Sequence, residues 1–516
     1  MFRSIVVFAL FLAATACAPV GVDQIAALSC KDPLAGLQAL PVKKRQQLDV
    51  KMLTRFYSTS TDCIWSTANE RILLEALDAA PAQGFPPDVF HAAAIRLARE
   101  PVEQELLLTD AALRYARAMR RGRVAPASLA RDVDITLPGY DLAQGLRGAL
   151  ATNTLAVWLR GLPPEQPGYT RLVDAYARYR ELAASGGWST LEVPGKPVKP
   201  GEQSSILPAL QQRLIAEDDL AVSQGASVYE RLEGPLLDAL KHFQKRHGLE
   251  ADGALGERTI AALNVSAVAR ADQIALNLER WRVLSGVIEP TRFEVNAASA
   301  TAALYVNGAI AFDMRVIVGA EDTPTPILMS DIDTVTINPS WVVPFSIVRK
   351  EILPAIKRDP DYLVKHDMDW QDGQLVQAPG EKNSLGRLKF EMPSAFSVYL
   401  HDTPARRLFA RDERALSHGC IRLERPLDLA EVLLADNPEW TRSDIEKAID
   451  EGATQHIRVN PLMPVVVLYW TSFVDPDGTV QFRDDIYGRD ARLEALLAGH
   501  KSTASLQGAR LTACHG

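Results

Sequence analysis

The sequence predicts a multidomain α+β protein with a helical N-terminal scaffold, a small three-helix domain and a mostly β C-terminal domain that holds a helical insertion. Apolar residues recur at three- and four-residue spacing as far as about residue 195, which is the period of amphipathic helices. From about residue 290, short apolar runs alternate with turn sequences, as expected of strands. A chain of 516 residues is long enough for three or four domains with their own cores.

The N-terminus has the pattern of a secretory signal over residues 1–17. A basic residue, Arg3, precedes an apolar run that is too short to span a membrane, and small residues precede Cys17. Cleavage after Ala16 and lipidation of Cys17 both stay open, because Ala14 occupies the position where a lipoprotein signal usually has leucine. We expect an exported protein. Its net charge of −8 argues against a nucleic-acid partner.

Export to an oxidising compartment bears on the cysteines. We predict a disulfide between Cys30 and Cys63, with two separately buried thiols as the alternative. Cys420 is expected to stay free, and Cys514 to be an unpaired thiol near the C-terminus.

Residues 40–195 are predicted to form the helical scaffold. Gly122 and Gly161 are expected to end two of its helices. No group of residues in this region suggests catalysis, so we interpret it as structural, with contact to a partner as the alternative. A run rich in Pro, Gly, Lys and Ser, residues 195–205, marks the boundary to the next domain.

Residues 206–264 are predicted to form the three-helix domain. Leu236, Leu240 and Phe243 line one helical face, and Asp252-Gly253 makes a turn before a last short helix.

The C-terminal domain is predicted to span residues 290–495. Asn307-Gly308 lies between two apolar runs and is a strong hairpin signal. Thr441 is expected to cap a helix that ends at Gly452. Residues 345–392 have helical spacing interrupted by prolines. We interpret them as an insertion that caps the active site, with a peripheral decoration as the alternative.

The stretch His401–Leu423 holds the candidate catalytic residues. His401 ends the alternating run SAFSVYLH, which predicts a strand, and Cys420 follows a glycine. A cysteine needs a nearby imidazole or positive field to react as a thiolate, and both His401 and His418 are candidate bases. A zinc site is disfavoured because the paired-ligand spacings CxxC and HExxH are missing here, and we expect no metal or cofactor.

The residues beside Cys420 suit substrate binding. Gly419 permits an unusual φ, and successive N–H groups there could stabilise an oxyanion. Arg422 would lie on the same side as Cys420 in an extended chain and could bind a substrate carboxylate.

This stretch resembles the signature of the L,D-transpeptidases, which are bacterial cell-wall enzymes. His401 stands 19 residues before Cys420, and the matching positions around the cysteine are Ser417, His418, Gly419 and Arg422. The resemblance implies that Cys420 is the nucleophile and His401 the base, and that the residues beside Cys420 form the oxyanion hole. The segment FRDDIYG, residues 482–488, resembles the long periplasmic branch of the family in Gram-negative bacteria. It implies a periplasmic protein, attached to the outer membrane if Cys17 is lipidated.

The three-helix domain resembles a peptidoglycan-binding domain. Its characteristic positions are matched by Phe243, Gln244, Gly248, Leu249, Asp252, Gly253, Gly256 and Thr259. These positions mostly define the fold, so the module as a whole, rather than any one of them, is expected to bind.

The resemblance implies that Cys420 attacks the L,D-peptide bond of a peptidoglycan stem tetrapeptide, releases D-alanine and passes the acyl group to an amine. Transfer to diaminopimelate would give a 3-3 cross-link. The alternatives are transfer to water as an L,D-carboxypeptidase, transfer to a lipoprotein lysine, or a catalytically silent scaffold that binds the wall. The expected partners are the stem peptides and the glycan.

Overall fold

The computed structural model describes residues 32–58, 62–221 and 229–499. The predicted signal sequence, Cys17, Cys30 and Cys514 lie outside these ranges. The described chain forms two compact units, of which the first takes in residues up to 79, 88–116 and 141–160, and the second takes in the rest. None of the helices in the described ranges is both long and apolar enough to cross a membrane.

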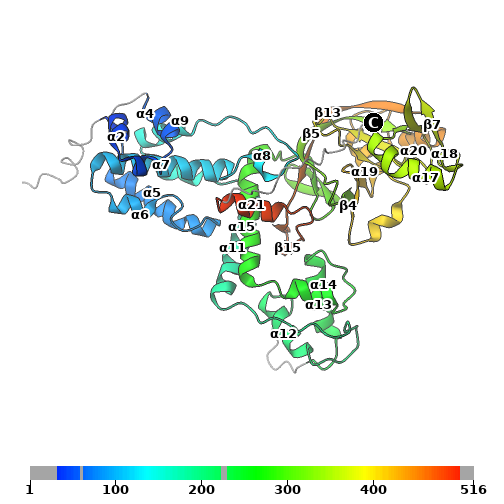
Figure 1. Ribbon diagram of the computed structural model, residues 1–516, viewed down its shortest axis with the longest axis horizontal. Coiled ribbons are helices and arrows are strands. Elements are labelled where there is room, and N and C mark those ends of the chain that lie inside the picture. Colours follow the sequence, from blue (N-terminus) through cyan, green and yellow to red (C-terminus); the bar gives the residue numbers. More distant parts are fainter. Residues whose placement is uncertain (1–31, 59–61, 222–228, 500–516) are drawn as a thin grey trace, which may run out of the picture. The chain divides into compact units, whose positions relative to one another are not determined.

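The first unit is helical, which confirms the predicted N-terminal helices (Figure 1). Its helices are α2 (Pro33–Ala39), α3 (Val42–Arg45), α4 (Val50–Tyr57), α5 (Thr67–Ala79), α6 (Ala92–Leu97), α9 (Leu142–Ala151), α10 (Leu155–Arg160) and the first part of α7 (Pro101–Arg121). Glu105 is buried on α7, where it accepts hydrogen bonds from the Tyr57 hydroxyl at 2.9 Å and from the Ile64 amide at 2.9 Å. Cys63, just before Ile64, is disulfide-bonded.

In the second unit, helices from both sides of the three-helix domain pack on the C-terminal sheet. They are α8 (Pro126–Leu129), α11 (Pro167–Ala184), α15 (Ala267–Leu284) and η2 (Ser285–Val287), and η1 (Ala80–Gln83) contacts α11. Buried residues of α11, such as Leu172, share one hydrophobic core with Ile274 of α15 and Val467 of the sheet. This last helix of the predicted scaffold therefore helps to form the core of the C-terminal domain.

The predicted three-helix domain consists of α12 (Leu207–Ala216), α13 (Gly234–Arg246) and α14 (Glu257–Leu263). Leu236, Leu240 and Phe243 are fully buried in its core, as predicted. Gln244 holds the following turn, because its side chain donates to Asp252 Oδ1 at 2.9 Å and accepts from the Gly253 amide at 2.8 Å. Gln244 therefore has a structural role.

The C-terminal domain is built on one large sheet. Its strands are β1 (Val133–Asp134), β2 (Arg292–Asn296), β3 (Thr301–Val306), β4 (Ala309–Gly319), β5 (Ile327–Ile337), β9 (Leu388–Glu391), β10 (Leu400–His401), β11 (Ala415–Ser417), β12 (Ile421–Leu423) and β13 (Gln455–Leu468). Their order is β1-β5-β13-β2-β3-β4-β12-β10-β9, with β11 beside β4. Because β9 also pairs with β5, the sheet closes on itself. Asn307 and Gly308, with φ of 50° and 84°, join β3 to β4 as predicted.

The insertion contains the predicted helices and also strands. Its helices are α16 (Phe345–Ile347), η3 (Val348–Ile352), α17 (Leu353–Arg358) and α18 (Tyr362–Lys365). Its strands β7 (Met368–Gln371) and β8 (Gln374–Gln377) form a small sheet with β6 (Trp341–Val342) over a core of its own. Asp372-Gly373, with positive φ at both residues, turns the hairpin. The chain is already back in the main sheet at β9, before the predicted end of the insertion.

The remaining elements flank the sheet. They are η4 (Arg406–Ala410), α19 (Pro426–Leu433), α20 (Arg442–Glu451), the hairpin of β14 (Ser472–Val474) and β15 (Val480–Phe482), and α21 (Arg489–Leu497). Asp477 and Gly478 lie in the turn between β14 and β15, as expected from the sequence.

Thr441→Ala is expected to reduce the free energy of unfolding by about 1 kcal/mol. Thr441 caps α20 in a capping box with Asp444, so the substitution removes a bond to an N-terminal amide of the helix. Urea unfolding measures the loss. Ser443→Ala, two positions along on the exposed surface, is the matched control and should leave the unfolding midpoint nearly unchanged.

Candidate active site

The strand that carries His401 is shorter than predicted. The alternating run Ser394–His401 suggested one continuous strand, but only Leu400 and His401 form β10. Ser397 has a φ of 52°, and its amide bonds back to the Ser394 carbonyl at 3.3 Å, so the run begins with a turn. His401 still lies at the C-terminal end of its strand, as predicted.

Cys420 lies between β11 and β12, beside β10. β10 and β12 run parallel, with Leu400 opposite Ile421 and His401 opposite Arg422. The Ile421 amide donates to the Tyr399 carbonyl at 3.1 Å. Cys420, just before β12, therefore lies beside Tyr399, just before β10. Cys420 is 5% exposed and packs in a small apolar cluster with Tyr399. The strand pairing thus gathers Cys420 and His401 at one edge of the site.

The prediction that Cys420 stays a free thiol is wrong for this structure, because its sulfur is disulfide-bonded. The prediction assumed that no second thiol reaches the site, and the sequence does not show which cysteine side chains approach one another. Nucleophilic chemistry at Cys420 therefore requires reduction of the disulfide first.

The loop before Cys420 is held by hydroxyl groups. Ser417 Oγ donates to the Cys420 carbonyl at 2.5 Å and accepts from the Gly419 amide at 3.1 Å. Thr325 Oγ1 donates to the Gly419 carbonyl at 2.9 Å. Gly419 has a φ of 113°, which side chains rarely permit. Ser417 thus fixes the backbone around Cys420, and the Gly419 amide, predicted for the oxyanion hole, is engaged by Ser417 here.

His401 is held as a neutral base. Its Nδ1 lies 2.6 Å from the Asp402 carbonyl, which can only accept, so Nδ1 carries the proton and Nε2 carries the basic lone pair. Burial, followed by the nearby positive charge of Arg422, lowers the pKa of His401 to about 3. The Asp402 side chain is itself fixed, because it accepts from Arg406 Nη2 at 2.7 Å and from the Arg387 amide at 2.9 Å.

Two cations flank His401 in the sheet. Arg422 is opposite His401 on β12, and Lys389 is opposite His401 on β9, so the three side chains share one face. The Nε of Arg422 is buried without a hydrogen-bond partner in the described part of the chain. Lys389 Nζ lies 4.5 Å from the centroid of the Tyr399 ring. Arg422 was predicted to bind a carboxylate. Lys389 was missed, although the alternation in LKFE could have placed it on a strand.

His418 contacts the insertion. Its Nε2 lies 2.6 Å from Glu351 Oε1, and Glu351 belongs to η3. Both side chains are substantially exposed. The insertion therefore reaches the catalytic motif, which favours the cap over a peripheral decoration.

Glu351→Gln is expected to change kcat/KM by less than about fivefold, because exposed ion pairs contribute roughly 0 to 1 kcal/mol. The measurement is turnover at low and high salt. Asp361→Asn, an exposed substitution elsewhere in the insertion, is the control. A loss of a hundredfold or more would instead assign Glu351 to the reaction itself.

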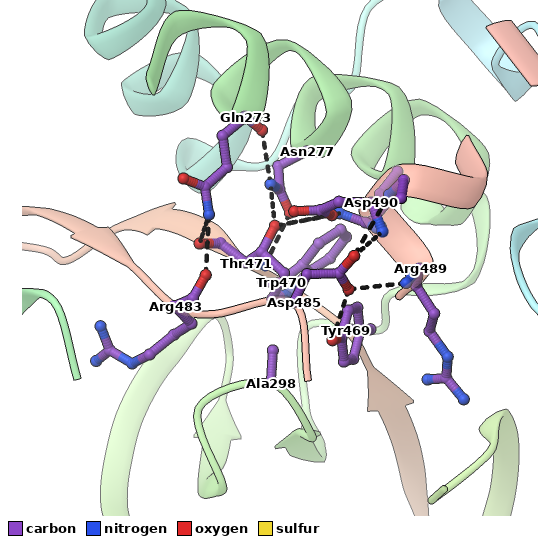
Figure 2. Close-up of polar contacts among 12 residues, drawn as sticks. Gln273, Asn277, Ala298, Tyr469, Trp470, Thr471, Arg483, Asp485, Arg489 and Asp490 are labelled. Carbon is purple, nitrogen blue, oxygen red and sulfur yellow. Dashed lines mark hydrogen bonds and ion pairs between the residues drawn. The ribbon is translucent and has the colours of Figure 1, made fainter. Parts of the chain in front are cut away.

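The FRDDIYG segment belongs to a hydrogen-bond network that joins α15 to the residues after β13 (Figure 2). Gln273 of α15 donates to the Thr471 and Arg483 carbonyls at 3.0 and 2.9 Å. Asp485 accepts from the Tyr469 hydroxyl at 2.8 Å and from the first amides of α21. The Tyr487 hydroxyl donates to the Gly319 carbonyl at 2.6 Å, next to the strand that pairs with the Cys420 loop. These residues position the site and do not enter it.

Comparison with known proteins agrees with this geometry. Residues 290–460 match the family described as L,D-transpeptidase catalytic domain, residues 51–175 match a scaffold domain, and residues 205–263 match the family described as "Putative peptidoglycan binding domain". The chain therefore carries a catalytic domain of the L,D-transpeptidase type and a peptidoglycan-binding domain, which confirms the resemblance.

A curated relative from Haemophilus influenzae, named "Putative L,D-transpeptidase", is 32% identical over 246 residues, which cover 43% of this chain and 48% of that protein. The match thus spans about half the length of the relative. Among solved structures, an L,D-transpeptidase from Mycobacterium smegmatis is 14% identical, with a TM-score of 0.19, over 34% of this chain and 58% of the other. The catalytic domain of the E. faecium L,D-transpeptidase is 15% identical, with a TM-score of 0.18, over 35% and 99%. Scores this low add nothing to the family matches.

Proposed function

We propose that the protein is a cysteine-dependent L,D-transpeptidase of peptidoglycan that works in the periplasm. The observation that supports the proposal is the pairing of β10 with β12 in the matched catalytic domain. From the register His401 opposite Arg422, we infer that His401, held neutral by its Nδ1 hydrogen bond, shares a face with Cys420. The peptidoglycan-binding domain supports the wall as the substrate.

In the proposed reaction, His401 Nε2 accepts the Cys420 thiol proton as the sulfur attacks the carbonyl of the L,D-peptide bond. Because His401 has a pKa of about 3, the thiol stays protonated at rest and proton transfer accompanies the attack. The Gly419 and Ile421 amides donate to Ser417 and to the Tyr399 carbonyl, so we assign the Cys420 amide to the oxyanion. The imidazolium then gives its proton to the leaving amine of D-alanine, and a thioester remains on Cys420. An acceptor amine attacks the thioester, passes a proton to His401 and restores the thiol.

The two cations beside His401, Arg422 and Lys389, favour a substrate with a carboxylate near the reacting bond. Arg422 and Lys389 lie on either side of His401, and because Lys389 Nζ is 3.5 Å from Glu391 Oε1, Arg422 is the main partner for such a group. A diaminopimelate side chain or the terminal D-alanine supplies one. We assign Arg422 and Lys389 to substrate binding and His418 to the contact with the insertion.

The test is an assay of the purified, reduced protein on disaccharide tetrapeptides, with products identified by mass. A cross-linked dimer with loss of D-alanine supports transpeptidation. Tripeptide alone indicates transfer to water, and a conjugate with added lipoprotein peptide indicates transfer to lysine. Absence of all three products with reduced protein would leave a wall-binding scaffold.

A further inference from the structure

A pocket lies between the peptidoglycan-binding domain and the β14–β15 hairpin. Its cavity is about 210 Å³, and its wall includes His247, Arg258, Arg270, Phe482, Arg483 and Asp484. None of these residues belongs to the proposed catalytic motif. The cavity is smaller than the roughly 300 Å³ of ordinary small-molecule pockets, so it suits one amino-acid-sized group.

Two arginines on this wall lack a carboxylate partner. Arg270 is 7% exposed and donates to the neutral oxygens of Gln273 at 3.0 Å and Ala262 at 3.1 Å. Its Nε has no hydrogen-bond partner in the described ranges. Neither arginine has an ion-pair partner within 4.0 Å among the described residues, and carboxylates act on them only at longer range, Glu217 on Arg270 and Asp475 on Arg483.

Arg483 also has N–H groups that its hydrogen bonds in the described part of the chain do not use. Its guanidinium donates to the carbonyls of Arg246 at 2.9 Å and Phe482 at 2.6 Å, and to Gln481 Oε1 at 3.0 Å. These three bonds leave two of its five N–H groups for a ligand. Figure 2 shows its guanidinium pointing away from the network that holds its backbone. Burial lowers the pKa of Arg270 and Arg483 to about 10, so both remain charged at neutral pH.

The remaining wall residues leave the pocket positive. His247 stacks between Phe243 and Phe482, and burial lowers its pKa well below the usual range, so it is neutral. Arg258 forms an exposed ion pair with Glu413 at 3.2 Å. With Arg258 paired to Glu413, Arg270 and Arg483 against Asp484 leave the wall a formal charge of +1, from 2 minus 1. A buried unpaired cation is costly, and an anionic ligand would offset that cost.

Gly248 leaves room for the Arg483 side chain, which lines this pocket. A Cβ at Gly248 would lie 2.7 Å from Arg483 Cδ, and its φ of 69° disfavours side chains as well. The glycine of the peptidoglycan-binding pattern therefore makes room for an arginine of the catalytic domain.

We propose that this pocket binds a carboxylate of a peptidoglycan stem peptide at a subsite distinct from Cys420. The identity of the ligand rests on the proposed function, whereas the preference for a compact oxyanion rests on the arginines. The subsite would hold wall peptides against the junction of the two domains.

The test is calorimetric titration of the full chain carrying Cys420→Ala with a synthetic stem tetrapeptide. Two binding events are expected. Arg483→Gln or Arg258→Gln should weaken one of them at least tenfold, and Arg483→Lys should weaken it less. Arg442→Gln, on an ion-paired arginine of α20 that is off the pocket wall, is the control and should keep both events. The same peptide with its carboxylates amidated should lose the event that depends on Arg483.

Equal binding by Arg483→Gln, Arg258→Gln and the parent would overturn the subsite. Binding of inorganic phosphate at the pocket, without binding of the carboxylate peptide, would overturn it as well. Turnover by chains with intact Cys420 separates this result from the proposed function. An inactive parent that still shows the Arg483-dependent event would refute the transpeptidase and retain the subsite. An active parent without that event would support the transpeptidase and refute the subsite.

Discussion

Cys420→Ala is expected to abolish acyl-enzyme formation and to reduce tetrapeptide turnover to background. The thioester requires a sulfur nucleophile, and a methyl group in its place offers no lone pair. The side chain is small and the surrounding loop is held by Ser417 and Thr325, so the fold should survive. Intact mass after incubation with a carbapenem, which the family resemblance implies as an acylating agent, measures the adduct.

Two controls accompany this experiment: reduction of the disulfide at Cys420 and substitution of a second cysteine. The unsubstituted chain should form the adduct only after the disulfide at Cys420 is reduced, because a disulfide sulfur cannot attack a carbonyl. Cys63→Ala changes the other disulfide-bonded cysteine in the described ranges and should leave the adduct intact once the protein is reduced. An adduct on Cys420→Ala, or turnover by it, would remove Cys420 from the mechanism.

Local sequence signals predicted the elements whose structure is determined locally. The Asn307-Gly308 turn, the Thr441 cap and the buried face of α13 were all confirmed, because backbone conformation and helical period decide them. Asp372-Gly373 is the same kind of signal, and it was missed inside a stretch interpreted as helical.

The rest depends on contacts between distant segments. The alternation in Ser394–Val398 resembles that of a strand, but none of the described strands pairs with it there, and it turns instead. Lys389 and Glu351 reach the site only through the closure of the sheet and the folding of the insertion. The roles of Cys420 and His401 were predicted from a motif, whereas their environment, including the disulfide and the low pKa of His401, required the structure.

His401→Ala is expected to lower kcat/KM by roughly 10² to 10⁴, the usual contribution of a general base. His418→Ala should cost far less, because its side chain pairs with Glu351 at the exposed edge of the insertion. Initial rates with a tetrapeptide substrate, measured on reduced protein, compare the two variants. A larger loss for His418→Ala would exchange the two roles.

The pH profile tests the same assignment independently. A base must be neutral to accept a proton, and with a pKa of about 3 His401 is neutral at every pH well above that value. Lowering the pH from 8 to 5 should therefore not remove the basic form of His401, and kcat/KM should show no acid limb near the ordinary histidine pKa of about 6.5. An acid limb that is lost in His418→Ala and kept in His401→Ala would mean that His418 is the base and that His401 only shapes the site.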